Sequence, residues 1–215
     1  MTPETEALLA SIRACTVCSD ALAAGPRPIV QFSETARIVI VGQAPGSKVH
    51  ASGIPWNDDS GDRLRGWTGL SKDEFYDPAR VALVPMGFCY PGKGNDGDLP
   101  PRQECAPLWH ARIMALLPPK RLTLLVGTYA QKAYLKLPKG ATLTDTVRAF
   151  DSYGPDFFPL PHPAWRSRIW MKGNPWFEQD VLPALQASVR ASLDPYRSAI
   201  PEATADGTLL SASTS

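Results

Sequence analysis

Four short, strongly hydrophobic runs separated by helical patterns constrain the fold of this chain more than any other feature. The runs are rich in Val, Ile, Leu and Phe and cover residues 37–41, 81–84, 122–126 and 157–160. A continuous apolar run is typical of a strand that is buried on both faces of a parallel sheet. We therefore predict an α/β fold with three layers, in which helices cover both faces of a central, mainly parallel four-stranded sheet.

Helical patterns lie between and around these runs. The predicted helices cover residues 2–14, 61–67, 102–117, 128–135 and 175–192. Thr2 is expected to cap the first helix, because Pro3 suits the first helical position. Asn174 is expected to cap the last helix, and Pro183 is expected to bend it.

The composition is that of an ordinary globular protein. Hydrophobic residues make up 44% and charged residues 20% of the 215 positions, which excludes a disordered or coiled-coil chain. We predict one domain over residues 1–194 and a flexible tail over 195–215, because the tail has few large apolar residues. No apolar run reaches the roughly 18 residues of a membrane span, and the first residues lack the pattern of a signal peptide, so a cytoplasmic location is expected.

Chemically active residues follow three of the predicted strands. Gln43 comes after the first strand, Cys89 after the second and His162 after the fourth. In open α/β sheets, ligands bind beyond the carboxyl ends of the strands. We therefore expect these loops to meet at one edge of the sheet.

The four cysteines form a pattern of their own. Cys15 and Cys18 are separated by two residues, and Cys89 and Cys105 flank a loop rich in Gly and Pro over 90–101. Such a loop can fold back and bring its ends together. In a reducing compartment, such cysteines are thiols or metal ligands rather than disulfides. Four thiolates suit either tetrahedral zinc or a [4Fe–4S] cluster, and buried free thiols are the alternative.

Taken together, these motifs resemble the uracil-DNA glycosylase superfamily, and most closely its iron–sulfur branch, often called family 4. The resemblance covers roughly residues 10–190. Residues 42–46 (GQAPG) are similar to motif A, residues 52–56 (SGIPW) to the stretch with the base-stacking aromatic, and residues 162–164 (HPA) to motif B. The cysteines resemble the cluster ligands of the branch in order and spacing. The resemblance therefore implies a structural [4Fe–4S] cluster, with zinc as the alternative.

The resemblance also implies a DNA repair enzyme. Such an enzyme hydrolyses the N-glycosidic bond of uracil or a related deaminated base in DNA and leaves an abasic site, after the base has left the duplex stack. Trp56 would stack on the base, and His162 would donate a hydrogen bond to the base oxygen as negative charge develops there. Gln43, Ala44 and Met86 would also contact the base. Judged alone, Trp56 would be a core residue and His162 a structural one.

Two positions differ from the iron–sulfur branch. The branch has acidic residues after motif A, whereas this chain has Ser, Lys, Val and His at 47–50, so the usual water-orienting carboxylate is missing there. His50, Asp58 and Asp59 are the replacements that we consider, and a cap of the helix at 61 is the alternative for Asp59. The branch also has an Asn that reads the uracil edge where this chain has Pro85 and Met86, which leaves the base specificity open.

DNA contacts are expected from a local patch, because 22 basic and 21 acidic residues give a net charge of only +1. Residues 159–177 contain basic and aromatic side chains and no acidic one. Trp165 or Arg166 would fill the space that the flipped base leaves, and Arg168 would contact phosphate. Gly46 and Ser47 would bring the main chain close to the DNA.

Two other functions remain open at this point. One is a member of the same superfamily that binds a lesion or traps it covalently, with His50 as the trapping group. The other is a nucleic-acid-binding module that a metal stabilises and that has no enzymatic activity. Neither reading involves a membrane, and the sequence leaves protein partners open.

Overall fold

The computed structural model describes residues 1–95 and 97–194; the tail expected over 195–215 lies outside the described residues. Helical and extended segments alternate along this part of the chain. In order, they are α1 (Pro3–Arg13), η1 (Ser19–Ala21), β1 (Ile38–Val41), α2 (Ser47–Ser52), α3 (Asp59–Thr68), α4 (Lys72–Tyr76), β2 (Val81–Leu83), β3 (Lys93–Gly94), β4 (Gly97–Asp98), α5 (Cys105–Leu116), β5 (Leu122–Val126), α6 (Thr128–Tyr134), α7 (Leu143–Arg148), η2 (Phe150–Tyr153), β6 (Phe157–Leu160), α8 (Ser167–Lys172), η3 (Phe177–Val181) and α9 (Leu182–Leu193).

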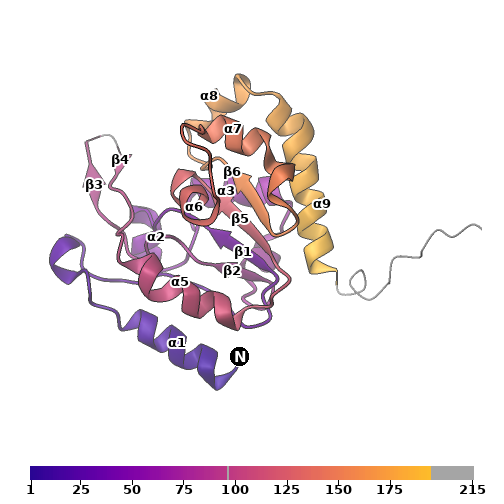
Figure 1. The fold of residues 1–215 in the computed structure, drawn as a ribbon. Coiled ribbons are helices and arrows are strands. Elements are labelled where there is room, and N and C mark those ends of the chain that lie inside the picture. The colour runs from indigo at the N-terminus through magenta and orange to yellow at the C-terminus, as the bar shows by residue number, and fades with distance from the viewer. Residues whose placement is uncertain (96, 195–215) are drawn as a thin grey trace, which may run out of the picture.

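A four-stranded sheet lies at the centre of the molecule (Figure 1). Its strand order is β2-β1-β5-β6, and all neighbouring strands are parallel. Ile38 of β1 lies opposite Val81 on one side and Leu122 on the other. The predicted α/β class is therefore confirmed, and the sheet is parallel throughout. All four carboxyl ends consequently point to the same edge.

Helices cover both faces of this sheet. Successive side chains of a strand point to opposite faces, so Ile38 and Ile40 pack on one side and Val39 and Val41 on the other. The first side packs against α3, α4, α7 and α9, and the second against α1, α5 and α6. Each strand residue of β1 is fully buried, which explains why the sequence shows no polar alternation there.

The long elements agree with the prediction, whereas several short helices were missed. The strands at 122–126 and 157–160 have the predicted bounds. Helices α2, α4, α7 and α8 have only five or six residues. Such segments make less than two turns, so they leave no helical period in the sequence.

The helix ends confirm one predicted cap and correct another. Thr2 caps α1, and its side chain accepts a hydrogen bond from the backbone N–H of Thr5. Asn174 does not cap the last helix, because its side chain donates backwards to the carbonyl of Trp170 at 2.8 Å. Pro183 lies in the first turn of α9, where proline is tolerated, and the irregular π-helical segment η3 precedes it.

A small hairpin, formed by β3 and β4, projects beside the carboxyl edge of the sheet (Figure 1). Lys93 pairs with Asp98 in its antiparallel ladder. The sequence predicted only an irregular loop here, because 90–101 has no apolar alternation. Every helix in the described part of the chain is too short or too polar to cross a membrane.

Candidate active site and cysteine pocket

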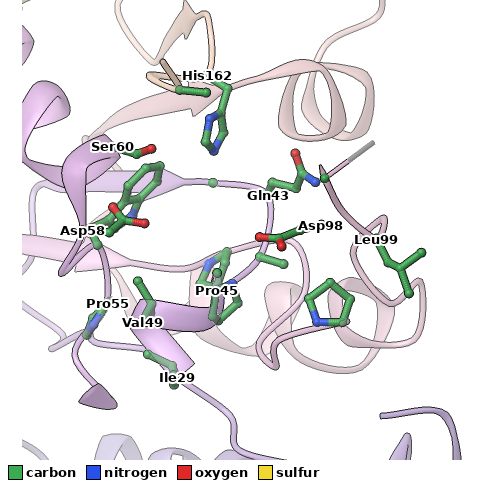
Figure 2. Close-up of a pocket in the computed structure, with 18 of the residues that line it drawn as sticks. Ile29, Gln43, Pro45, Val49, Pro55, Asp58, Ser60, Asp98, Leu99 and His162 are labelled. Atoms are coloured by element: carbon green, nitrogen blue, oxygen red, sulfur yellow. The ribbon is translucent and has the colours of Figure 1, made fainter. Parts of the chain in front are cut away.

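The loops at the carboxyl edge of the sheet surround a cavity of about 460 Å³ (Figure 2). Walls come from the loops after β1, β2 and β6, from the start of α3 and from the β3–β4 hairpin. Eight residues that the sequence singled out lie in this lining: Gln43, Ala44, Gly46, Trp56, Asp58, His162, Trp165 and Arg166. The expectation that the strand-end loops meet at one edge is therefore confirmed.

Trp56 forms one side of the cavity in an unusual backbone conformation. Its φ of 57° is the only positive φ of a non-glycine residue in the described part of the chain. The indole lies directly on Gly42, where an added Cβ would come within 2.6 Å of the ring. A bulky residue adopts this conformation only when its surroundings impose it. The structure therefore holds the indole at the cavity wall.

The carbonyl group of Trp56 is part of this constraint. It accepts hydrogen bonds from the hydroxyl of Tyr76 at 3.2 Å and from Arg65 at 3.4 Å. The same carbonyl lies over Gly61 in α3, where a Cβ would be only 1.7 Å from the oxygen. Glycine at 61 is therefore required for this arrangement of Trp56.

His162 enters the cavity from the loop after β6. Gly127, at the end of β5, makes room for it, because a Cβ there would touch the histidine side chain at 3.4 Å. The imidazole lies 5.9 Å from the Trp56 ring, measured between centroids, with an interplanar angle of 30°. It has no hydrogen bond to another residue in the described part of the chain, and its nitrogens are free to bind a ligand.

The charge state of His162 follows from its surroundings. Burial lowers the pKa of this imidazole below its ordinary value, and the nearby carboxylates of Asp58 and Asp98 oppose that shift. The ring is therefore neutral near pH 7 and carries one N–H donor. A neutral imidazole in this place can donate to an oxygen that gains negative charge.

The loop that carries the histidine is fixed by an arginine from α3. One guanidinium nitrogen of Arg63 donates to the carbonyls of Pro163 and Ala164, at 2.6 and 2.8 Å. The sequence analysis did not single out Arg63, because α3 and this loop lie far apart in the chain. Its contacts orient the loop without touching the cavity interior.

Gln43 offers the cavity an amide group. Its backbone carbonyl accepts a hydrogen bond from the N–H of Gly87, which fixes the loop after β1 against the loop after β2. Its side-chain amide, in contrast, has no hydrogen-bond partner among the described residues. The amide provides two donors and one acceptor oxygen, which suits the polar edge of a base.

Two carboxylates face the cavity from different sides (Figure 2). Asp58 also caps α3, because its Oδ1 accepts a hydrogen bond from the N–H of Gly61 at 2.8 Å. Asp98, at the end of the β3–β4 hairpin, was missed by the sequence analysis, since the loop around it carries no motif. Both carboxylates lie beside Gly46, with Oδ2 atoms 3.9 and 3.4 Å from the position of an added Cβ, for Asp58 and Asp98 respectively.

Four of the predicted site residues lie outside the cavity lining. His50 is on α2 with its ring 5.8 Å from that of Tyr90, and its Nδ1 is buried without a partner in the described structure. Met86 packs into the core on the α1, α5 and α6 side of the sheet. Ser47 and Arg168 are exposed on the surface.

The mouth of the cavity carries an exposed aromatic residue. Trp165 is 65% exposed and also lines the cavity, and the guanidinium of Arg166 lies 5.3 Å from its ring centroid. Ile169, one helical turn further along, is 67% exposed. Trp165 therefore presents an exposed apolar surface at the mouth of the cavity.

The four cysteines line a second, smaller pocket together. They come from the loop after α1, the loop after β2 and the start of α5. Apolar residues surround them, among them Phe88 and Trp109. Burial raises the pKa of Cys105 to about 11 and also raises that of Cys89, so both are neutral thiols near pH 7 in the protein alone.

The donor set in this pocket consists of four thiol groups. Four thiolates are the ligand set of a [4Fe–4S] cluster and also of a tetrahedral zinc ion. Within residues 1–95 and 97–194, the side chains form no ready-made group of three ligands for a single metal ion. Arg102 adds a positive charge beside the pocket, and hydrogen bonds to Glu104 and Cys18 raise its pKa.

A comparison with known protein families agrees with this geometry. The family model of the uracil DNA glycosylase superfamily matches residues 29–186, which is well over half of the chain. This span contains every residue that lines the cavity. It also contains Cys89 and Cys105 but begins after Cys15 and Cys18.

Proposed function

Because the chain belongs to the uracil-DNA glycosylase superfamily, we propose that it removes uracil or a related deaminated base from DNA. The reaction is hydrolysis of the N-glycosidic bond, and the product is an abasic site. The enzyme is monofunctional in this proposal, since hydrolysis needs water and no covalent bond to the protein.

One observation carries the proposal: Trp56, Gln43 and His162 line the same cavity. These three groups supply what a flipped base requires, namely a flat surface for stacking, an amide for its polar edge and a donor for its oxygen. The three residues come from distant parts of the chain. The parallel sheet brings them together at its carboxyl edge.

The chemistry follows from the charges that develop as the bond breaks. The deoxyribose becomes positive and the departing base becomes negative. In our proposal His162 donates its N–H to the base oxygen, and this donation strengthens as the oxygen gains charge. The carboxylates of Asp58 and Asp98 stabilise the positive sugar, because both face the same cavity.

DNA binds across the mouth of the cavity in this proposal. Trp165 occupies the place of the flipped base in the stack, and Arg166 and Arg168 contact phosphates. Gly46 lines the cavity and Ser47 follows it on the surface, and in this proposal their main chain approaches the DNA strand. A few local contacts suffice for a protein with a net charge of +1.

We also propose that the cysteine pocket holds a [4Fe–4S] cluster, as in the iron–sulfur branch of the superfamily. Cys15, Cys18, Cys89 and Cys105 would be its ligands, and zinc is the less favoured alternative. The cluster would stabilise the fold by tying the segment after α1 to α5. It would supply no chemistry for bond cleavage.

The proposed activity is tested with a duplex oligonucleotide that contains one uracil. We expect release of free uracil and a strand break only after alkali, on a denaturing gel. Parallel substrates with hypoxanthine, xanthine and a thymine mismatch determine the base specificity. A stable protein–DNA adduct would instead favour covalent trapping, which has less support because His50 does not line the cavity. DNA binding without base release would favour a binding module.

A further inference from the structure

Hydrolysis of the glycosidic bond needs a group that holds the attacking water and accepts its proton. His50 does not line the cavity, so it is not placed for this task. Among the residues that line the cavity, two carry carboxylates, Asp58 and Asp98. The choice between them rests on what each carboxylate already does in the fold.

Asp58 has a structural task. Its Oδ1 accepts the N–H of Gly61 at the first turn of α3, which is the usual bond of a helix N-cap. The helix cap accounts for an aspartate at this position without a role for it in activating water. Its charge still acts on the cavity, since it is the larger of the two carboxylate influences on His162.

Asp98 has no such structural task. It is exposed, and it forms no ion pair in the part of the chain that the structure describes. Its one side-chain hydrogen bond comes from the hydroxyl of Tyr90, at 3.4 Å to Oδ1. Its Oδ2 lies against Gly46, and Figure 2 shows the carboxylate below Gln43, facing the cavity.

We propose that Asp98 is the catalytic residue that holds the attacking water and accepts its proton, and that Tyr90 is a positioning residue for it. The water oxygen forms a bond to C1′ of the deoxyribose while the bond from C1′ to the base nitrogen breaks. The electron pair leaves with the base, and the water proton moves to the carboxylate. This inference rests on the proposed function.

Asp98 belongs to the β3–β4 hairpin and not to one of the loops that follow the strands of the central sheet. Gly97 has a φ of 135°, which favours glycine and allows the chain to turn just before Asp98. Leu99 follows and also lines the cavity, with 44% of its side chain exposed. The hairpin therefore brings one charged and one apolar side chain to the cavity mouth.

The test compares base release under single-turnover conditions in four variants of the full chain. Asp98→Asn is expected to lower the rate by about 10²-fold, the usual contribution of a general base. Asp98→Glu should recover part of the rate, and Tyr90→Phe should lower it by a smaller factor. Asp59→Asn is the matched control, because Asp59 pairs with Lys48 on the surface and does not line the cavity.

Two further measurements separate catalysis from structural damage. The affinity for uracil-containing DNA should be the same in Asp98→Asn and the unmodified protein, since the loss is in the chemical step. NMR titration of the three histidines should show a lower pKa for His162 in Asp98→Asn, because a charge that raises it is removed. Asp59→Asn should leave the His162 titration unchanged.

The outcomes distinguish this inference from the proposed function. If the unmodified protein releases the base and Asp98→Asn does so at a rate within about threefold of it, the role of Asp98 is overturned. The proposed function is not affected by that result. A large loss in Asp98→Asn that is accounted for entirely by weaker DNA binding would overturn it as well. No base release by the folded, unmodified protein would overturn the proposed function, and the catalytic role of Asp98 with it.

Discussion

The two pockets of this molecule share a wall but differ in what they contain. The loop after β2 contributes Pro85 and Pro91 to the cavity, and Phe88 and Cys89 to the cysteine pocket. The cavity contains polar groups that have no hydrogen-bond partner among the described residues, such as the side-chain amide of Gln43. The cysteine pocket is lined by four cysteines and by mainly apolar residues, with Arg102 beside them. In our proposal, one scaffold therefore separates a place for chemistry from a place for cross-linking.

The difference predicts that changes in the two pockets have different effects. A change in the cysteine pocket should lower the stability of the whole chain, because this pocket joins segments that are far apart in sequence. A change of Gln43 or His162 in the cavity should lower activity and leave the fold intact, because their side chains form no hydrogen bond with other described residues. The following predictions test this separation, from the largest expected effect to the smallest.

The largest effect is expected from Cys105→Ala. Loss of one ligand should remove the brown colour and the broad absorbance at about 400 nm, and lower the unfolding free energy by about 4 kcal/mol or more. Absorbance, iron analysis and urea unfolding measure this. Leu108→Ala, on the exposed side of the same helix, is the control and should keep the colour. A colourless protein with one equivalent of zinc would contradict the cluster.

His162→Ala should lower activity and leave stability unchanged, in contrast to Cys105→Ala. Loss of the donor to the base oxygen is expected to lower single-turnover base release by about 10²–10³-fold. Colour, melting temperature and DNA affinity should remain close to those of the unmodified protein. Unchanged base release would remove His162 from the mechanism.

Two glycines of α3 test how the cavity is built. Gly61→Ala should lower the unfolding free energy by about 1–3 kcal/mol and reduce base release, because the new Cβ displaces the Trp56 carbonyl. Gly66→Ala is the matched change on the same helix, where nothing lies within 4 Å. It should stabilise the protein by about 0.5–1 kcal/mol and keep its activity. Equal effects of the two changes would contradict the role of Gly61.

The surface at the cavity mouth is tested by the salt dependence of DNA binding. Arg166→Ala and Arg168→Ala should each lower the slope of log affinity against log salt by about 1. Lys120→Ala is the control, because Lys120 precedes β5 at the opposite edge of the sheet. A lower slope in the control, or none in the two arginine variants, would place the DNA elsewhere.

The smallest effect is expected from His110, which contacts one residue of each pocket. Its ring stacks on Phe88 of the cysteine pocket, and its Nε2 lies 3.0 Å from the carbonyl of Pro85 at the cavity. Burial lowers its pKa below the ordinary 6.5, so the unfolded chain binds more protons than the folded one. Stability should therefore fall as the pH drops below about 6.5.

Urea unfolding at pH 8 and pH 5.5 measures this dependence. His110→Gln should reduce the difference between the two pH values, whatever its effect on stability at pH 8. NMR titration should give a pKa below 6.5 for His110. A value at or above 6.5 would contradict the burial effect.

The sequence predicted those parts of the site that depend on the sheet. Gln43 and His162 follow buried strands, and the carboxyl ends of parallel strands meet at one edge of the sheet. The sequence alone therefore predicted that both residues lie at that edge. Trp56 came from the resemblance, and only the structure explains its position, through the glycines at 42 and 61. Contacts between distant segments leave no local pattern in the sequence.

The same limit explains what the sequence analysis missed. Asp98 lies in a segment with neither apolar alternation nor a helical period, and its approach to the cavity depends on a hairpin of two-residue strands. The resemblance placed Met86 at the nucleobase, but its side chain packs into the core instead. The direction of one side chain after a strand depends on the turn geometry, which composition does not fix.

The most direct test of the account is a crystal structure with DNA that contains 2′-fluoro-deoxyuridine, whose glycosidic bond resists hydrolysis. We predict that the uracil ring lies in the cavity, stacked on Trp56, with its O2 about 3 Å from the imidazole of His162. A uracil that remains in the duplex stack, or binds outside this cavity while the DNA is bound, would contradict the account.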